Sequence, residues 1–200
     1  MQLQGQSGGH VLVGVGGGIA AYKTCELVRL LIKDGLEVQV ALTGAAAQFV
    51  TALTFQSLSG REVYADVFAA ERADIAHITL AAEARAMIIA PATADLIGRI
   101  AGGLAADPVS LLCLALPAEV PVILAPAMNT RMWENPLVQG NLDRLRGLRR
   151  PGAGAKYRVI DPVTGFLACR TEGLGAMADP AAIHAALREV LQEASGRPEQ

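Results

Sequence analysis

Short aliphatic runs alternate with longer stretches of helical periodicity along this chain, and no other feature limits its fold as strongly. Strands separated by helices form right-handed βαβ units around a parallel sheet. The sequence therefore predicts an α/β fold with a mainly parallel sheet between layers of helices. The predicted strands are Val11–Val15, Glu37–Leu42, Ala86–Ala90, Val120–Ala125 and Tyr157–Ile160.

The segments between these runs carry apolar residues at helical spacing. A last helix is expected to begin at Asp179-Pro180, because an N-cap residue is followed there by proline in the first turn. Val109–Leu116 fits either a helix or a strand. The other predicted helices cover Ile19–Lys33, Ala45–Ser59, the stretch after the third strand to Leu104, and about Met132–Leu145.

Length and composition are consistent with one domain. The chain has 200 residues, and we expect a polar lead-in over 1–10, a single domain over 11–194 and a tail over 195–200. Hydrophobic residues make up 52% of the chain but aromatic ones only 4%, a mixture that suits a buried parallel sheet. The 17 basic and 19 acidic residues form no basic tract, which argues against nucleic-acid binding.

The longest uncharged stretches are shorter than the roughly 20 residues of a spanning helix, so we expect no membrane segment. No basic region precedes the apolar run Val11–Val15, which argues against a secretory signal. The 3 cysteines are scattered and odd in number, which argues against a disulfide framework and favours a reducing cytoplasm.

Ligands of open parallel sheets bind at the carboxyl ends of the strands. We therefore expect the segments that follow the strands to meet at one edge of the sheet. These segments are Gly14–Ile19, Thr43-Gly44, Pro91–Asp95, Pro126–Asn129 and the long loop Asp161–Met177.

The first of these segments is a glycine-rich turn between a strand and a helix. Such a turn fits a phosphate group, which would bind at the helix N-terminus, but it also fits a plain tight turn. It is not the dinucleotide fingerprint, because Ile19 replaces the last glycine and Thr43 stands where an acidic residue would bind the ribose. A nicotinamide dehydrogenase is therefore disfavoured, and the turn lacks the Gly-Lys-Ser/Thr of a P-loop.

Four polar residues near the predicted edge have both a structural and a functional interpretation. Asp95 and Asn129 each follow a strand and a proline; helix capping is favoured for Asp95, and a ligand contact for Asn129. His77 lies among apolar residues, where a structural histidine is the more common case. Cys169 lies in a glycine-bracketed loop that could close over a ligand.

The remaining histidines and cysteines receive no functional role. His10 and His184 fall on the lead-in and the last helix, and Cys25 and Cys113 lie in apolar periodic segments where they are expected to be small core residues.

Taken in order, several motifs resemble the flavin-dependent cysteine decarboxylases, and most closely the bacterial phosphopantothenoylcysteine decarboxylases of coenzyme A synthesis. The resemblance runs from about Val11 to Pro180. The motifs are GGGIAAYK (Gly16–Lys23), LTFQSLSG (Leu53–Gly60), His77-Ile78, APATAD (Ala90–Asp95), APAMNTRMW (Ala125–Trp133) and LAC…GLGAM (Leu167–Met177).

This resemblance implies a Rossmann-like, flavodoxin-like sheet that binds FMN, no metal, and a homo-oligomer, either a trimer or an assembly of trimers with active sites at subunit contacts. It implies that thiol oxidation precedes CO₂ loss, and that an enethiolate is then reduced. The catalytic residues implied are His77, at the thiol, and Cys169, as proton donor. The substrate-binding residues implied are Asn129, Met132, Phe166 and Ala168, and the FMN-binding residues are Gly17, Gly18, Ile19, Thr43, Thr93, Ala94, Asp95, Leu96 and Ala127.

The chain departs from the family pattern at Arg170, where glycine is usual, at Asp95, where many relatives have asparagine, and over Ala105–Asp107, which lacks a polar residue often found there. Two alternatives stay open. A peptidyl-cysteine decarboxylase would stop at the enethiol and would not need Cys169. A regulatory homologue without catalysis tends to lose part of the set formed by His77, Asn129 and Cys169, all of which are present.

Overall fold

Five parallel strands form the central sheet of the computed structural model, which describes residues 9–67, 73–166 and 172–195. The strands lie in the order β2-β1-β3-β4-β7, and every neighbouring pair is parallel. Their bounds are β1 His10–Val15, β2 Val38–Leu42, β3 Ala84–Ala92, β4 Val122–Pro126 and β7 Tyr157–Val159. The predicted α/β sandwich with a parallel sheet is confirmed.

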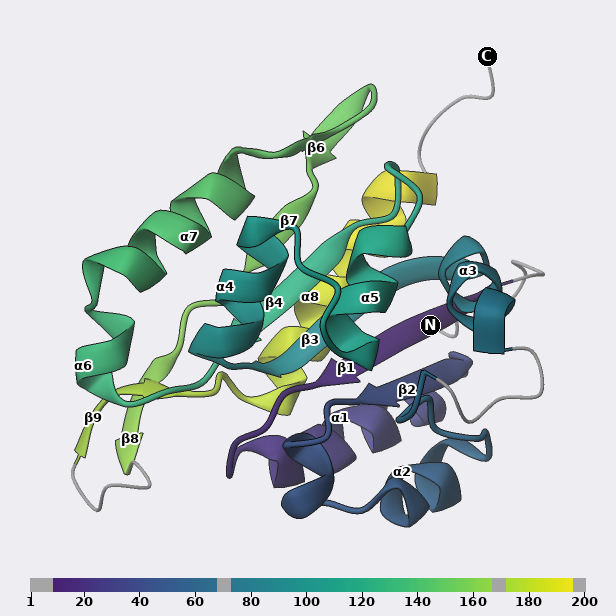
Figure 1. Ribbon diagram of the computed structural model, residues 1–200, viewed down its shortest axis with the longest axis horizontal. Coiled ribbons are helices and arrows are strands. Elements are labelled where there is room, and N and C mark those ends of the chain that lie inside the picture. Colours follow the sequence, from purple (N-terminus) through teal and green to yellow (C-terminus); the bar gives the residue numbers. More distant parts are fainter. Residues whose placement is uncertain (1–8, 68–72, 167–171, 196–200) are drawn as a thin grey trace.

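Helices cover both faces of the sheet (Figure 1). One face is covered by α1 Ala21–Lys33, α2 Ala52–Ser59 and α8 Pro180–Ser195. The other face is covered by α3 Ala73–Ala82, α4 Ala94–Gly102, α5 Pro108–Ala115 and α7 Pro136–Gly147.

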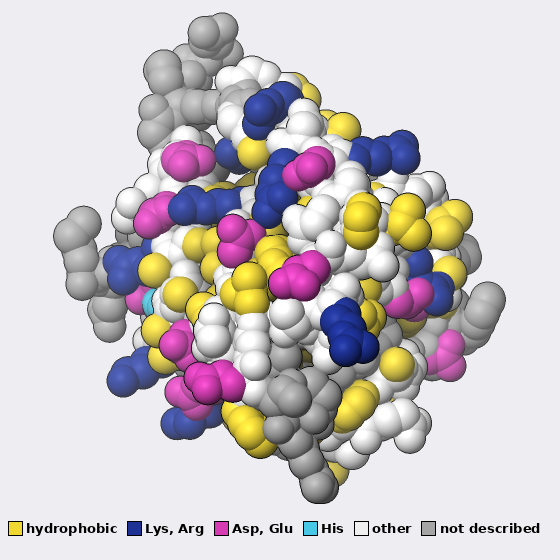
Figure 2. Space-filling model, turned by 90° about the vertical axis from the view of Figure 1, so that its left-hand side faces the viewer, with side chains coloured by type: hydrophobic (Ala, Val, Ile, Leu, Met, Phe, Trp, Pro, Cys, Tyr) yellow, Lys and Arg dark blue, Asp and Glu magenta, His cyan; other side chains and the backbone are white. Residues whose placement is uncertain are grey.

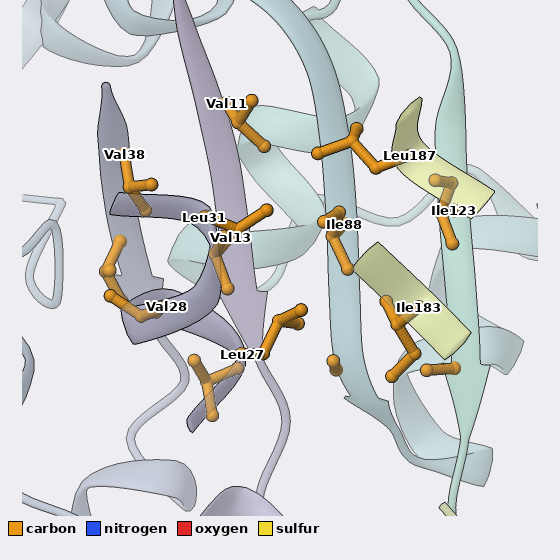
Figure 3. Packing of buried hydrophobic residues seen from close by; sticks show 14 of the residues in the cluster. Val11, Val13, Leu27, Val28, Leu31, Val38, Ile88, Ile123, Ile183 and Leu187 are labelled. Carbon is orange, nitrogen blue, oxygen red and sulfur yellow. The ribbon is translucent and has the colours of Figure 1, made fainter. Parts of the chain in front are cut away.

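Alternate residues of each strand point to opposite faces, so the sheet contributes to two separate cores. Figure 3 shows Val13 of β1 and Ile88 of β3 on the face of the sheet that Leu27 of α1 and Ile183 of α8 cover. The neighbouring Leu12 and Met87 point the other way, into the second core. All six residues of β1 are buried, as expected for a central parallel strand.

The chain reverses direction across the sheet next to β1. It runs from β1 outward to β2 on one side, and it then returns to β3 on the other side. The loops after β1 and β3 therefore diverge and leave a crevice at their carboxyl ends, which is where ligands of doubly wound sheets bind.

Two predicted helices are interrupted in the structure. The stretch Ala45–Ser59 divides into the 3₁₀ turn η1 Ala46–Gln48 and α2, because Thr51 takes an extended conformation with ψ of 154°. The predicted helix over about Met132–Leu145 divides into α6 Thr130–Trp133 and α7, because Pro136 cannot continue a helix and begins a new one capped by Asn135.

The ambiguous segment Val109–Leu116 forms helix α5. Its start is fixed by Asp107, whose carboxylate accepts hydrogen bonds from the N–H groups of Val109 and Ser110, and by Pro108 in the first turn. Helix α3 and two hairpins were not predicted. The hairpins pair β5 Arg149–Arg150 with β6 Ala153–Ala155, and β8 Val163–Phe166 with β9 Glu172–Ala176.

Within the described ranges, none of the helices has both the length and the apolar character that crossing a bilayer requires.

Candidate functional site

A cavity of about 1130 Å³ opens at the carboxyl edge of the sheet. Residues from all five segments expected to meet there line it, and the fifth segment contributes through the hairpin of β8 and β9. The structure thus brings together every predicted cofactor- or substrate-binding residue that it describes. These are Gly17, Gly18, Ile19, Thr43, Thr93, Ala94, Asp95, Leu96, Ala127, Asn129, Met132 and Phe166.

The glycine-rich turn forms one wall of this cavity. A Cβ atom on Gly17 would lie 2.3 Å from the Cβ of Ala45, so only glycine lets the turns after β1 and β2 approach this closely. Within the part of the chain that the structure describes, the backbone N–H groups of Gly17, Gly18 and Ile19 have no hydrogen-bond partner. These donors precede helix α1, and together they form an arrangement suited to a phosphate group.

Two threonine hydroxyls shape the neighbouring loops. Thr43 accepts a hydrogen bond from the N–H of Ala46 at 3.0 Å, and Thr93 accepts one from the N–H of Leu96 at 3.3 Å. Thr93 is therefore the N-cap of α4. The expectation that Asp95 caps this helix is wrong, because Asp95 lies in its first turn instead.

Asp95 is paired with Arg99, one helical turn further along α4. The Nε of Arg99 donates to Oδ2 of Asp95 at 2.7 Å, and this hydrogen bond raises the pKa of Arg99 above its ordinary value. The same Nε lies 4.0 Å from Oδ2 of Asp107, and all three side chains belong to residues that line the cavity. Arg99 and Asp107 were missed as site residues, although the four-residue spacing of Asp95 and Arg99 places them on one face of a helix.

Asn129 caps a helix, one of the two roles considered for it, and its contact with a ligand stays a prediction. Its Oδ1 accepts a hydrogen bond from the N–H of Arg131 at 2.9 Å and so caps α6, and the residue also lines the cavity. The adjacent Met128 donates its N–H to the carbonyl oxygen of Gly175 at 3.0 Å. The hairpin of β8 and β9 is thereby joined to the loop that carries Asn129.

Lys23 and Tyr22 are further wall residues that the sequence reasoning missed. Lys23 lies in the first turn of α1, four residues after Ile19, and its Nζ lies 3.4 Å from the carbonyl oxygen of Met177. The cavity thus includes a cation one helical turn from the unpaired N–H groups.

The two predicted catalytic residues are placed differently. His77 lies on α3 and is not among the residues that line the cavity. Its ring is partly buried, and its Nδ1 has no hydrogen-bond partner within the described ranges. Cys169 and the predicted substrate contact Ala168 fall outside the described residues.

Acidic and basic side chains are interspersed on the face of the molecule formed by α6, α7 and the hairpin of β8 and β9. Figure 2, which faces α6, α7 and the hairpin of β8 and β9, shows acidic and basic side chains mixed with hydrophobic ones. Several are paired, as in Arg146, which contacts Asp143 at 3.1 Å and Asp161 at 3.0 Å. The described residues of this face therefore form no continuous basic surface of the kind that binds nucleic acid.

Comparison with known proteins shows relatives over most of the chain. A family model described as Flavoprotein matches residues 2–192. The coenzyme A biosynthesis bifunctional protein CoaBC of Haemophilus influenzae is 46% identical over 197 residues, and the match covers 96% of this chain but 46% of that protein. A probable phosphopantothenoylcysteine decarboxylase of Streptococcus mutans is 42% identical, and the match covers 84% of this chain and 91% of that protein. The chain thus spans about half the length of the bifunctional relative and nearly all of the shorter one.

Two solved structures share the fold. A cysteine-to-serine variant of a PPC decarboxylase in complex with pantothenoylaminoethenethiol superposes with a TM-score of 0.80 at 29% identity, covering 92% of this chain and 99% of that chain. The FMN-binding protein AtHal3 superposes with a TM-score of 0.76 at 30% identity, covering 95% and 99% of the two chains.

Proposed function

The chain belongs to the flavoprotein family, and from that membership we propose that it is an FMN-dependent carboxy-lyase of coenzyme A synthesis. Its substrate is 4′-phosphopantothenoylcysteine, and its product is 4′-phosphopantetheine. The proposal concerns decarboxylation, the activity in the name of the Streptococcus mutans relative, of which the match covers 91%. The observation that carries it is the convergence of the glycine turn, the Thr93–Leu96 segment and the Asn129–Met132 segment on one cavity.

The residues present fit FMN. The unpaired N–H groups of Gly17, Gly18 and Ile19 suit its phosphate, and the Nζ of Lys23 supplies positive charge nearby. The small side chains of Ala94 and Ala127 allow a flat ring close to the backbone at the ends of β3 and β4. When bound, FMN would supply the thiol oxidation that lets CO₂ leave without forming an unstabilised carbanion, and it would supply the later reduction of the enethiolate.

The substrate side of the cavity carries Asn129, Met132 and Phe166. We assign Asn129 to the substrate carboxylate, which its amide would hold by a neutral hydrogen bond; the cap of α6 orients this side chain. Met132 and Phe166 are 47% and 78% exposed, so each has apolar surface available to cover a ligand.

His77 is assigned to the substrate thiol, as acid, base or orienting group. Because His77 is absent from the cavity wall of its own subunit, we propose that it acts in the cavity of a second copy of the chain. Helix α3 also carries the exposed apolar residues Ile75 and Ile78, and it packs against α5, where Leu114 is exposed. An apolar surface of this kind suits contact between copies, in a homotrimer or an assembly of trimers.

Cys169 is assigned to protonation of the enethiolate carbon after CO₂ has left. A thiol, with an ordinary pKa of about 8.5, is a far better acid than the hydroxyl of serine. We further propose a cytoplasmic location, in keeping with the odd number of cysteines, which is 3.

The test uses the purified chain with FMN and 4′-phosphopantothenoylcysteine, and it measures both CO₂ and the saturated product. We expect repeated turnover by the wild-type chain, whereas Cys169→Ser releases CO₂ about once per flavin and accumulates the enethiol. If the wild-type chain itself stops at the enethiol, a peptidyl-cysteine decarboxylase is the better assignment. If it binds FMN and releases no CO₂ from either kind of substrate, it is a regulatory homologue.

A further inference from the structure

Arg99 lies between two carboxylates in the wall of the cavity. Its Nε is 2.7 Å from Oδ2 of Asp95 and 4.0 Å from Oδ2 of Asp107. Asp95 belongs to the same helix, whereas Asp107 belongs to the start of α5, so the arginine connects two elements that border the cavity.

The pair of Asp95 and Arg99 is too exposed to contribute much to folding. The side chain of Asp95 is 68% exposed and that of Arg99 is 32% exposed. Ion pairs at such positions are screened by solvent and add little to stability. Asp107 is held independently of the arginine, because it already accepts hydrogen bonds from Val109, Ser110 and the Ser110 hydroxyl.

The charges around the cavity point to a different role for this arginine. Among the described residues that line it, the cations are Lys23 and Arg99, and the acids are Asp95, Asp107 and Asp179. The wall is therefore weakly negative already, although the proposed cofactor carries a doubly charged phosphate. Loss of Arg99 would leave three acids against one cation and would repel that phosphate.

We propose that Arg99 is a positioning residue that neutralises Asp95 and so permits a phosphorylated flavin to bind in the cavity. The inference rests on the proposed function, since it takes FMN as the ligand. It assigns the effect to charge: Arg99 acts through Asp95 and need not contact the flavin. The same compensation favours reduction of the bound flavin, because a reduced flavin is more negative than an oxidised one.

The test measures the dissociation constant of FMN by flavin fluorescence, for the wild-type chain and for single and double variants. We expect Arg99→Gln to bind FMN about tenfold more weakly at low salt, with a smaller loss at high salt. Arg99→Lys keeps the charge and should bind like wild type. The double variant Asp95→Asn/Arg99→Gln restores the wild-type net charge of the wall and should recover the affinity.

A second measurement is the reduction potential of the bound flavin. A role confined to helix stability would leave it unchanged, whereas Arg99→Gln should move it to a more negative value. Arg146 offers a matched control, because it also contacts two carboxylates, Asp143 and Asp161, but it does not line the cavity. Arg146→Gln should leave both the FMN affinity and the potential unchanged.

The inference is overturned if Arg99→Gln binds FMN as tightly as wild type, or if Arg99→Lys loses affinity to the same extent as Arg99→Gln. It is also overturned if the double variant binds no better than Arg99→Gln. In these cases the wild-type chain still binds FMN and the proposed function stands. A wild-type chain that fails to bind FMN overturns both.

Discussion

The backbone N–H of Met128 donates a hydrogen bond to the carbonyl oxygen of Gly175 at 3.0 Å. This bond joins two distant parts of the chain, because Gly175 lies on β9 and Met128 follows β4. Gly175 has a φ of +147°, and a Cβ atom there would lie 2.2 Å from the carbonyl oxygen of Met128. The hairpin can therefore approach the loop bearing Asn129 only with glycine at this position.

Gly175→Ala is expected to destabilise the protein by about 1–3 kcal/mol, because the added methyl group meets a backbone oxygen and the φ is unfavourable for alanine. The measurement is the free energy of unfolding from a urea titration. Gly140→Ala is the control: Gly140 lies in α7, a Cβ added there would meet no atom within 4 Å, and alanine favours helix by up to about 1 kcal/mol. Equal stability of Gly175→Ala and wild type would show that the close approach is not needed.

Gly17→Val should purify with little or no bound flavin. Its side chain would collide with Ala45, which lies 2.3 Å from the Cβ position, and the turn would have to move away from the cavity. Flavin content is read from the visible spectrum of the purified protein. Gly98→Ala is a suitable comparison, since its Cβ would make an ordinary contact at 3.7 Å to Nδ2 of Asn141 and Gly98 does not line the cavity. A yellow Gly17→Val protein would contradict the assigned phosphate site.

His77→Asn should keep the fold and FMN but lose about 10²–10⁴-fold in turnover, as expected for loss of a general acid or base. Asn129→Leu should also be inactive. Because the proposed site combines His77 of one copy with Asn129 of another, co-expression of the two variants should restore about a quarter of the wild-type sites. The readout is CO₂ release from the mixed protein. Mixed protein that stays inactive would place His77 and Asn129 in the same subunit's site, whereas near-normal turnover of His77→Asn alone would remove His77 from the mechanism.

Protonation of His10 should lower the stability of the folded protein in mild acid. The residue is only 2% exposed, and burial is the main cause that lowers the pKa of its imidazole below 6.5, with Arg61 adding to the shift. The unfolded chain then binds a proton at a higher pH than the folded chain does. Stability is therefore full above about pH 6.5 and falls as the pH drops from there through the folded-state pKa. Unfolding titrations from about pH 8 to about pH 5 should show a smaller acid loss for His10→Leu than for wild type; identical profiles would exclude His10 as the cause.

The sequence alone determined the layered fold and the place of the site. Strand and helix periodicity is local, so the aliphatic run Val11–Val15 and the helix that follows it could be identified without tertiary contacts. Parallel strands all end at one edge, so the segments after them had to converge there. On that basis the sequence predicted that Gly17, Thr43 and Asn129 lie near one another, and all three line the cavity.

Tertiary structure alone decided which side chains interact within that site. Arg99 lies 4.0 Å from Asp107 because α4 packs beside the start of α5, a relationship that no local pattern encodes. Its pairing with Asp95, in contrast, follows from their four-residue spacing along α4. The contact between Gly175 and Met128 likewise joins segments far apart in the sequence. His77 was expected at the ligand, but its helix α3 packs against α5, and His77 does not line the cavity of its own chain. The sequence could not show this, because the position of a helix on the sheet depends on long-range packing.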